Sequence, residues 1–119
     1  MKYLLLMYHT EGVFSESELP PAREESVALC HELHAKGQYL AAAPLEPIST
    51  AQSVQVRNGK LSVTDGPFAE TKEQLGGYIL IDVDSMEKAV EIASRFPAAQ
   101  RGTVEVRPIV DLSAVLPIV

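Results

Sequence analysis

Two side chains that can move protons stand at the ends of predicted strands. His9 follows the apolar run Tyr3–Tyr8, and Asp65 opens an Asp-Gly-Pro turn after an alternating run. An imidazole titrates near neutral pH, which suits general base work. A carboxylate held by the Gly-Pro pair and desolvated by the neighbouring Phe68 would also exchange protons near neutrality. The sequence therefore predicts Asp65 as a catalytic acid or base, assisted by His9.

Ordinary structural roles remain open for both residues. Asp65 can instead cap the backbone amides that follow it in an Asx turn, which needs no ligand. A histidine at the end of a strand can equally be structural or solvated. If Asp65 is a cap, its replacement costs stability, whereas if it is a base, its replacement costs activity.

Five further residues could hold a polar ligand beside this pair. Tyr8 and Tyr78 carry hydroxyls on the sheet face that we assign to a cleft or a dimer. Glu70 and Lys72 lie on the polar loop that follows the Asp-Gly-Pro turn. The predicted ligand-binding residues are Tyr8, Phe68, Glu70, Lys72 and Tyr78. The alternatives are packing for the tyrosines and a solvated ion-pair surface for the charged residues.

Neither a metal nor a cofactor is predicted. His31 and His34 lie three residues apart and would share a helix face, a spacing that could seat one metal ion. No further ligand completes that set, so a solvated helix face is favoured. Gly76 and Gly77 precede a strand and open no helix, which argues against a phosphate-binding loop. Cys30 has no cysteine partner and is expected to be a small core residue.

The composition is that of a single cytoplasmic domain over residues 1–119. With 119 residues, 46% of them hydrophobic, the chain can bury one core without disulfides. Ten Lys and Arg against sixteen Asp and Glu give a formal charge of -6, which argues against nucleic-acid binding. One cysteine fits a reducing compartment, and the longest apolar run is too short to cross a membrane.

Periodicity predicts six strands and two helices. The strands are expected over Lys2–His9, Tyr39–Ala43, Ser53–Arg57, Lys60–Thr64, Tyr78–Val83 and Thr103–Ile109. The helices are expected over Ala22–Lys36 and from an Asp84-x-x-Glu87 capping box to a stop at Pro97. Asn58-Gly59 predicts a two-residue turn that places Val56 opposite Leu61, Val54 opposite Val63 and Gln55 opposite Ser62.

This order predicts a ferredoxin-like α+β fold, with two β-α-β halves around an inserted β-hairpin at about residues 53–64. Helices on one side cover only one face of the sheet. Apolar side chains would point to the other face, namely Leu4, Leu6, Tyr8, Tyr78 and Leu80. Because such a face needs a cover, we expect a homodimer that packs sheet against sheet as a dimeric α+β barrel. The alternative is that the hairpin and the C-terminal tail fold back over the sheet.

A long non-periodic motif, TDGPFAETKEQLGG, runs from Thr64 to Gly77. Together with MKYLLL at residues 1–6, Leu-Glu-Pro at 45–47 and GTVEVRP at 102–108, it resembles the DGPF-type branch of the YCII-related domain family. The resemblance covers the chain from Met1 to about Pro108, and it implies a ferredoxin-like dimeric α+β barrel. Smaller relatives are proposed to use a His-Asp pair in a cleft. Its Asp corresponds to Asp65, whereas its His falls near Ser26.

Two functions from different classes follow. The first is a small-molecule-binding protein or cofactor-independent enzyme, which would isomerise a small organic acid or lactone or eliminate a group from it in a cleft at the barrel mouth. The second is a non-enzymatic regulatory or interaction module. The resemblance connects that module to extracytoplasmic-function sigma-factor signalling, because genes of the DGPF-type branch often lie beside such factors. The sequence leaves open whether the protein is an enzyme at all.

Overall fold

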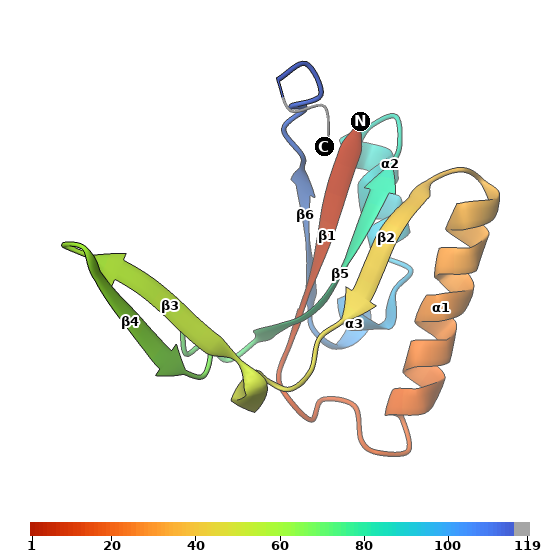
Figure 1. Cartoon of the computed structure of the whole chain (residues 1–119). Helices are drawn as coiled ribbons and strands as arrows, with labels where there is room; N and C mark the ends of the chain where they lie inside the picture. The colour runs from red at the N-terminus through yellow and green to blue at the C-terminus, as the bar shows by residue number, and fades with distance from the viewer. Residues whose placement is uncertain (116–119) are drawn as a thin grey trace.

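The computed structural model describes residues 1–115, and Figure 1 shows the arrangement of its elements. The elements follow one another as β1 (Lys2–His9), α1 (Leu19–Ala35), β2 (Tyr39–Pro44), the 3₁₀ turn η1 (Ile48–Thr50), β3 (Gln52–Arg57), β4 (Lys60–Asp65), β5 (Gln74–Asp82), α2 (Met86–Ala93), α3 (Pro97–Arg101) and β6 (Thr103–Pro108). No helix within residues 1–115 is long and apolar enough to cross a membrane.

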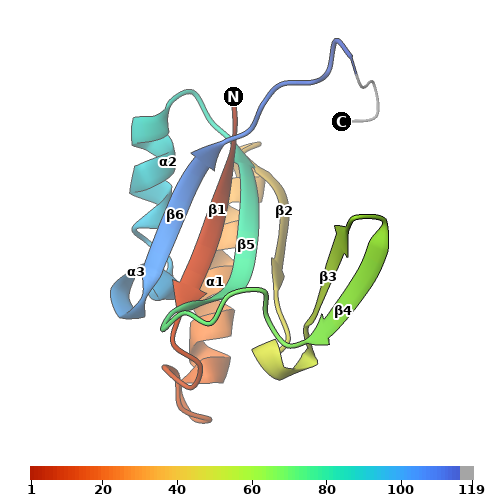
Figure 2. The ribbon, with the colours of Figure 1, turned by 90° about the vertical axis from the view of Figure 1, so that its left-hand side faces the viewer.

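Four strands form an antiparallel sheet in the order β2-β5-β1-β6, which is the ferredoxin-like arrangement that the sequence predicts. β1 and β5 are the central pair, because each has a strand on both sides. All three helices lie behind one face of this sheet, and the other face carries no helix (Figure 2). The sheet therefore has a covered face and an open face.

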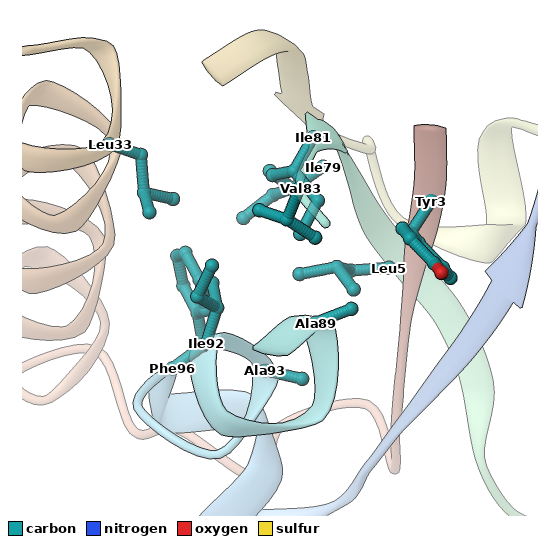
Figure 3. Close-up of a cluster of buried hydrophobic side chains, with 10 residues drawn as sticks. All are labelled: Tyr3, Leu5, Leu33, Ile79, Ile81, Val83, Ala89, Ile92, Ala93 and Phe96. Atoms are coloured by element: carbon teal, nitrogen blue, oxygen red, sulfur yellow. The ribbon is translucent and has the colours of Figure 1, made fainter. Parts of the chain in front are cut away.

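The hydrophobic core lies between the covered face and the helices, and Figure 3 shows its side chains. From the strands come residues of one parity, Tyr3, Leu5, Ile79 and Ile81, as the two-residue period of a strand requires, and Val83 continues this pattern just beyond β5. The helical side contributes Leu33, Ala89, Ile92, Ala93 and Phe96. Half-buried side chains of the opposite parity, among them Leu4, Leu6, Tyr78 and Leu80, lie on the open face.

The inserted hairpin β3–β4 has the register that the sequence predicts, with Val56 opposite Leu61 and Val54 opposite Val63. Its turn residues Asn58 and Gly59 both have positive φ, at 52° and 75°, as a twist-matched two-residue turn demands. The hairpin extends away from the sheet (Figure 1).

The hairpin does not fold back over the open face, so this part of the alternative cover is wrong for the single chain. Its apolar face stays in solvent, with Val54, Val56, Leu61 and Val63 between 52% and 68% exposed. The last residues of the C-terminal tail, 116–119, lie outside the described residues.

The helix boundaries differ from the expected ones for local reasons. α1 begins at Leu19 rather than Ala22 because Ser15 and Glu18 form a capping box one turn earlier, with each side chain accepting the backbone N–H of the other. α2 is capped by Ser85, whose hydroxyl accepts the N–H of Lys88, and not by Asp84.

Pro97 does not simply stop a helix. α2 ends at Ala93, and Pro97 opens the short helix α3, since a proline at the first helical position needs no hydrogen-bond donor. β5 also begins earlier than predicted, at Gln74, because Leu75 and Gln74 pair with the end of β1 beyond a bulge.

Candidate functional site

A cleft of about 910 Å³ lies between α1 and the covered face of the sheet, beside β2. Its walls come from β1 and the loop that follows, from α1, from β2 and the segment leading to η1, from β5 and from the start of α3. Polar and ionisable residues on these walls include His9, Glu11, Arg23, Ser26, Cys30, His31, His34, Tyr39, Glu46 and Gln74. The volume lies in the range of about 300–1,000 Å³ typical of small-molecule sites.

The cleft exists because small residues face each other across it. They are Ala22, Ser26 and Cys30, spaced four apart on one face of α1, and Ala42, Ala43 and Gly77 on the sheet. Near its C-terminal end, α1 instead places the buried Leu33 into the core. One end of the helix is therefore held by packing, while short side chains at the other end leave space against the sheet.

His9 lines the cleft at the end of β1, where two glycines leave room for it. A Cβ at Gly76 would collide with His9 Nε2, and a Cβ at Gly102 would collide with the Tyr8 carbonyl and crowd the Cβ of His9. Gly76 is the residue that bulges out of the β1–β5 register. The bulge thus places Gly76, which has no side chain, against the imidazole of His9.

The tautomer of His9 follows from its hydrogen bond. His9 Nδ1 lies 3.2 Å from the carbonyl oxygen of Thr10, which can only accept. The neutral ring therefore carries its proton on Nδ1 and leaves the lone pair of Nε2 free. In chemical terms, Nε2 is a proton acceptor on the wall of the cleft.

The loop after β1, residues 10–18, forms a rim of the cleft, and contacts hold this rim on two sides. The ring of Phe14 meets His9 edge to face at 6.0 Å, and Arg101 stacks over Phe14 at 5.2 Å. Arg101 also donates to the Val13 carbonyl at 3.1 Å and pairs with Glu18 at 2.6 Å. The Arg101 hydrogen bond, with further bonds from Ser15, lowers the pKa of Glu18 to about 2.

On the other side, the rim is tied to η1. Glu11 Oε1 accepts the backbone N–H of Ile48 at 2.7 Å. Inside the cleft, burial raises the pKa of the Cys30 thiol, so that the sulfur stays protonated and is no activated nucleophile. The cleft therefore offers no activated thiol, whereas the imidazole of His9 is a proton acceptor beneath an anchored loop.

The structure separates the two predicted catalytic residues. His9 borders the cleft, whereas Asp65 ends β4 on the projecting hairpin and is absent from the cleft walls. Asp65 is exposed, and its carboxylate accepts from the Gln52 side chain at 3.2 Å rather than from the amides that follow. The predicted desolvation by Phe68 is wrong for the single chain, because that ring is 81% exposed.

The predicted ligand-binding residues are also dispersed. Tyr8 precedes His9 on the strand and so points to the open face, where its hydroxyl lies 3.4 Å from Glu105. Glu70 and Lys72 are exposed on the loop before β5. Tyr78 borders the cleft beside β2, although strand alternation gives its side chain the direction of Leu80 on the open face. Of the five predicted ligand-binding residues, Tyr78 therefore borders the cleft together with His9, whereas Tyr8, Phe68, Glu70 and Lys72 do not.

His31 and His34 both border the cleft, on the side of α1. The ring of His34 meets Tyr39 at 6.3 Å. Within residues 1–115 no group of three or more metal-ligating side chains is placed to hold an ion.

Sequence reasoning missed the part of the site contributed by α1 and by the rim. Neither Arg23 nor Phe14 was predicted as a site residue, and Ser26 was identified only as the position near which the His of the smaller relatives falls. The available signal was the run of small residues Ala22, Ser26 and Cys30 at a four-residue spacing, since such a face cannot fill the space against a sheet.

Comparisons with known proteins agree with this fold. The chain matches the family model described as YCII-related domain over residues 1–113. It is 36% identical over 118 residues to an uncharacterised protein of Rhizobium meliloti (strain 1021), covering 92% of both chains. A similar solved structure is 5-chloro-2-hydroxyhydroquinone dehydrochlorinase (TftG) from Burkholderia phenoliruptrix AC1100, in complex with 2,5-dihydroxybenzoquinone. Its TM-score is 0.51 at 12% identity, over 92% of this chain and 94% of the other.

Proposed function

Because this chain belongs to the YCII-related domain family, and because its main cleft presents an unprotonated imidazole nitrogen, we propose that it binds a small organic molecule between α1 and the sheet. His9 is the proton acceptor of this site. The observation that carries the proposal is the bond from His9 Nδ1 to the Thr10 carbonyl, which leaves Nε2 free beside Gly76.

The reaction that fits this site is proton transfer without a cofactor. Nε2 takes a proton from an acidic C–H or O–H of the ligand, and the electron pair left behind moves into a neighbouring carbonyl or expels a leaving group. Isomerisation and elimination both begin in this way. Support by analogy comes from the structural neighbour, a dehydrochlorinase in complex with 2,5-dihydroxybenzoquinone.

We propose further that the chain belongs to the DGPF-type branch and works in the cytoplasm as a homodimer, a dimeric α+β barrel. The support for dimerisation is the half-buried apolar face of the sheet together with the exposed apolar face of the hairpin. A second copy would cover both. Asp65 belongs to the hairpin in this arrangement and takes no part in the chemistry of its own chain's cleft.

The experiment is a thermal-shift screen against small organic acids, lactones and phenols, because a ligand that binds the native state raises its melting temperature. Wild type is compared with His9→Asn, whose side-chain amide keeps a donor in the place of Nδ1 but offers nothing at Nε2. For a compound that turns over, we expect His9→Asn to retain the fold and lose turnover by about 10²–10⁴-fold, as for a general base.

Asp65→Asn is the matched control, since it removes one ionisable group from the hairpin. We expect it to bind and turn over every hit like wild type. Loss of activity in Asp65→Asn with full activity in His9→Asn would return the catalytic role to Asp65.

The exposed hairpin favours a second candidate, the non-enzymatic interaction module. Its apolar residues Val54, Val56, Leu61 and Val63 form a continuous exposed stripe, which suits a protein partner. If no compound in a broad library stabilises the protein, the cleft proposal fails and this candidate takes its place.

A further inference from the structure

We propose that the cleft selects organic anions and that Arg23 binds their carboxylate or phenolate group. This inference rests on the function proposed above and specifies its substrate class. The starting observation is that Arg23, on the α1 wall of the cleft, forms no ion pair and no hydrogen bond within the described residues.

The spacing along α1 explains why Arg23 has no partner on its own helix. Residues three and four positions away on either side share its face, and these are Leu19, Pro20, Ser26 and Val27. None of them is a carboxylate. Lys36, by contrast, has Glu32 four residues earlier and pairs with it at 3.6 Å. Of the other arginines, Arg95 and Arg101 pair with Glu32 and Glu18, whereas Arg57 and Arg107 form no ion pair within the described residues and do not border the cleft.

Three of those four neighbours also border the cleft, namely Leu19, Ser26 and Val27. Arg23 itself is exposed and lies at the edge of the cleft beside these apolar and small side chains, where its guanidinium can form charge-assisted hydrogen bonds with a bound anion. Ser26 donates its hydroxyl proton to the Ala22 carbonyl at 3.0 Å, so its oxygen is an acceptor toward the cleft. Arg23 is then the cationic donor of the α1 wall.

The start of α1 does not compete for the anion. A helix N-terminus usually offers free N–H groups to an anion, but Pro20 and Pro21 have none. The N–H groups of Leu19 and Ala22 are taken by the carbonyls of Ser15 and Glu18. The planar guanidinium of Arg23, which matches a carboxylate with two parallel bonds, is a charged donor at this end of α1.

The negative groups on the opposite walls leave Arg23 available. Glu11 accepts the Ile48 amide, and Glu46, on the segment between β2 and η1, forms no ion pair with Arg23. The predicted occupant is a compact, mostly apolar acid, with its anionic group at Arg23 and its acidic proton within reach of His9.

The test measures binding by titration calorimetry with matched acid and amide pairs: benzoate with benzamide, 4-hydroxybenzoate with 4-hydroxybenzamide, and cyclohexanecarboxylate with its amide. Wild type should bind at least one acid about ten- to a hundredfold more tightly than its amide, the ratio expected of a charge-assisted bond. Arg23→Gln should abolish that ratio, and Arg23→Lys should retain part of it. Lys88→Gln, which changes the net charge equally but lies on α2, should keep the full ratio.

The outcomes separate this inference from the proposed function. If acids and amides bind equally well and His9→Asn still loses turnover of a bound substrate, the cleft stands and the role of Arg23 is wrong. If acids are preferred equally in Arg23→Gln and wild type, another group binds the anion and the inference is overturned. If no acid in these pairs binds at all, the cleft is not selective for such anions, and the wider screen decides the proposed function.

Discussion

At the scale of single residues, the position of the His9 ring depends on Gly76, which has no side chain to displace it. We predict that Gly76→Ala displaces the imidazole, because the new methyl group would occupy the position of Nε2. The obstacle is the end of a side chain that can rotate, so the fold should lose little stability while the cleft loses its proton acceptor. NMR should show the His9 ring resonances shifted, and ligand turnover should fall as in His9→Asn.

Gly102→Ala is the informative comparison, because its Cβ would strike the backbone carbonyl of Tyr8 rather than a ring. Backbone cannot rotate away, so this variant should lose about 1–3 kcal/mol of unfolding free energy, measured in urea. Unchanged His9 resonances in Gly76→Ala, or equal stability losses in the two variants, would contradict our account of the bulge.

The same scale shows what the sequence could and could not predict about the site. It placed His9 at the end of the first strand, and the structure has it there. It also grouped Tyr8 and Asp65 with His9. Adjacent residues of a strand point to opposite faces, which separates Tyr8, and the direction of a projecting hairpin is set by no local pattern, which separates Asp65.

At the scale of elements, the pair of Glu18 and Arg101 joins the start of α1 to the end of α3. Hydrogen bonds from Arg101 and from Ser15 lower the pKa of Glu18 from its ordinary 4.5 to about 2. A carboxyl with a lowered pKa stabilises the fold above its unfolded value and loses that contribution as the pH falls. We predict that wild type is more stable than Glu18→Gln at pH 7 and that the difference disappears between about pH 4.5 and 2.

Urea unfolding of both proteins across that range measures the difference directly. Glu24→Gln is the control, because Glu24 is exposed and makes no hydrogen bond or ion pair within the described residues. A Glu18→Gln variant whose stability tracks wild type at every pH would show that the link between α1 and α3 contributes nothing.

The elements whose structure follows from a short stretch of sequence were the most predictable. The turn at Asn58-Gly59 fixes the hairpin register, because only residues that tolerate positive φ fit there. The start of α1 was misplaced, because the capping box of Ser15 and Glu18 gains support from Arg101, 83 residues away from Glu18. A contact between distant parts of the chain leaves no periodic trace in the sequence.

At the scale of the whole molecule, two apolar surfaces lack a cover among residues 1–115 of the single chain. One is the open face of the sheet, and the other is the apolar stripe of the hairpin. We propose that a two-fold arrangement of two copies covers both at once, with each hairpin packed on the other subunit. We predict that the protein sediments at micromolar concentration with twice the 12.9 kDa mass of the chain.

Val56→Lys tests this assembly without disturbing the core. Val56 is 59% exposed on the hairpin, so a lysine there costs the single chain no interior packing. In a dimer it would bury an unpaired charge, and the variant should therefore sediment as a monomer with an unchanged circular dichroism spectrum. Ser62→Lys adds the same charge to the opposite face of the hairpin and should remain dimeric. A monomeric wild type, or a dimeric Val56→Lys, would mean that the hairpin serves a different partner.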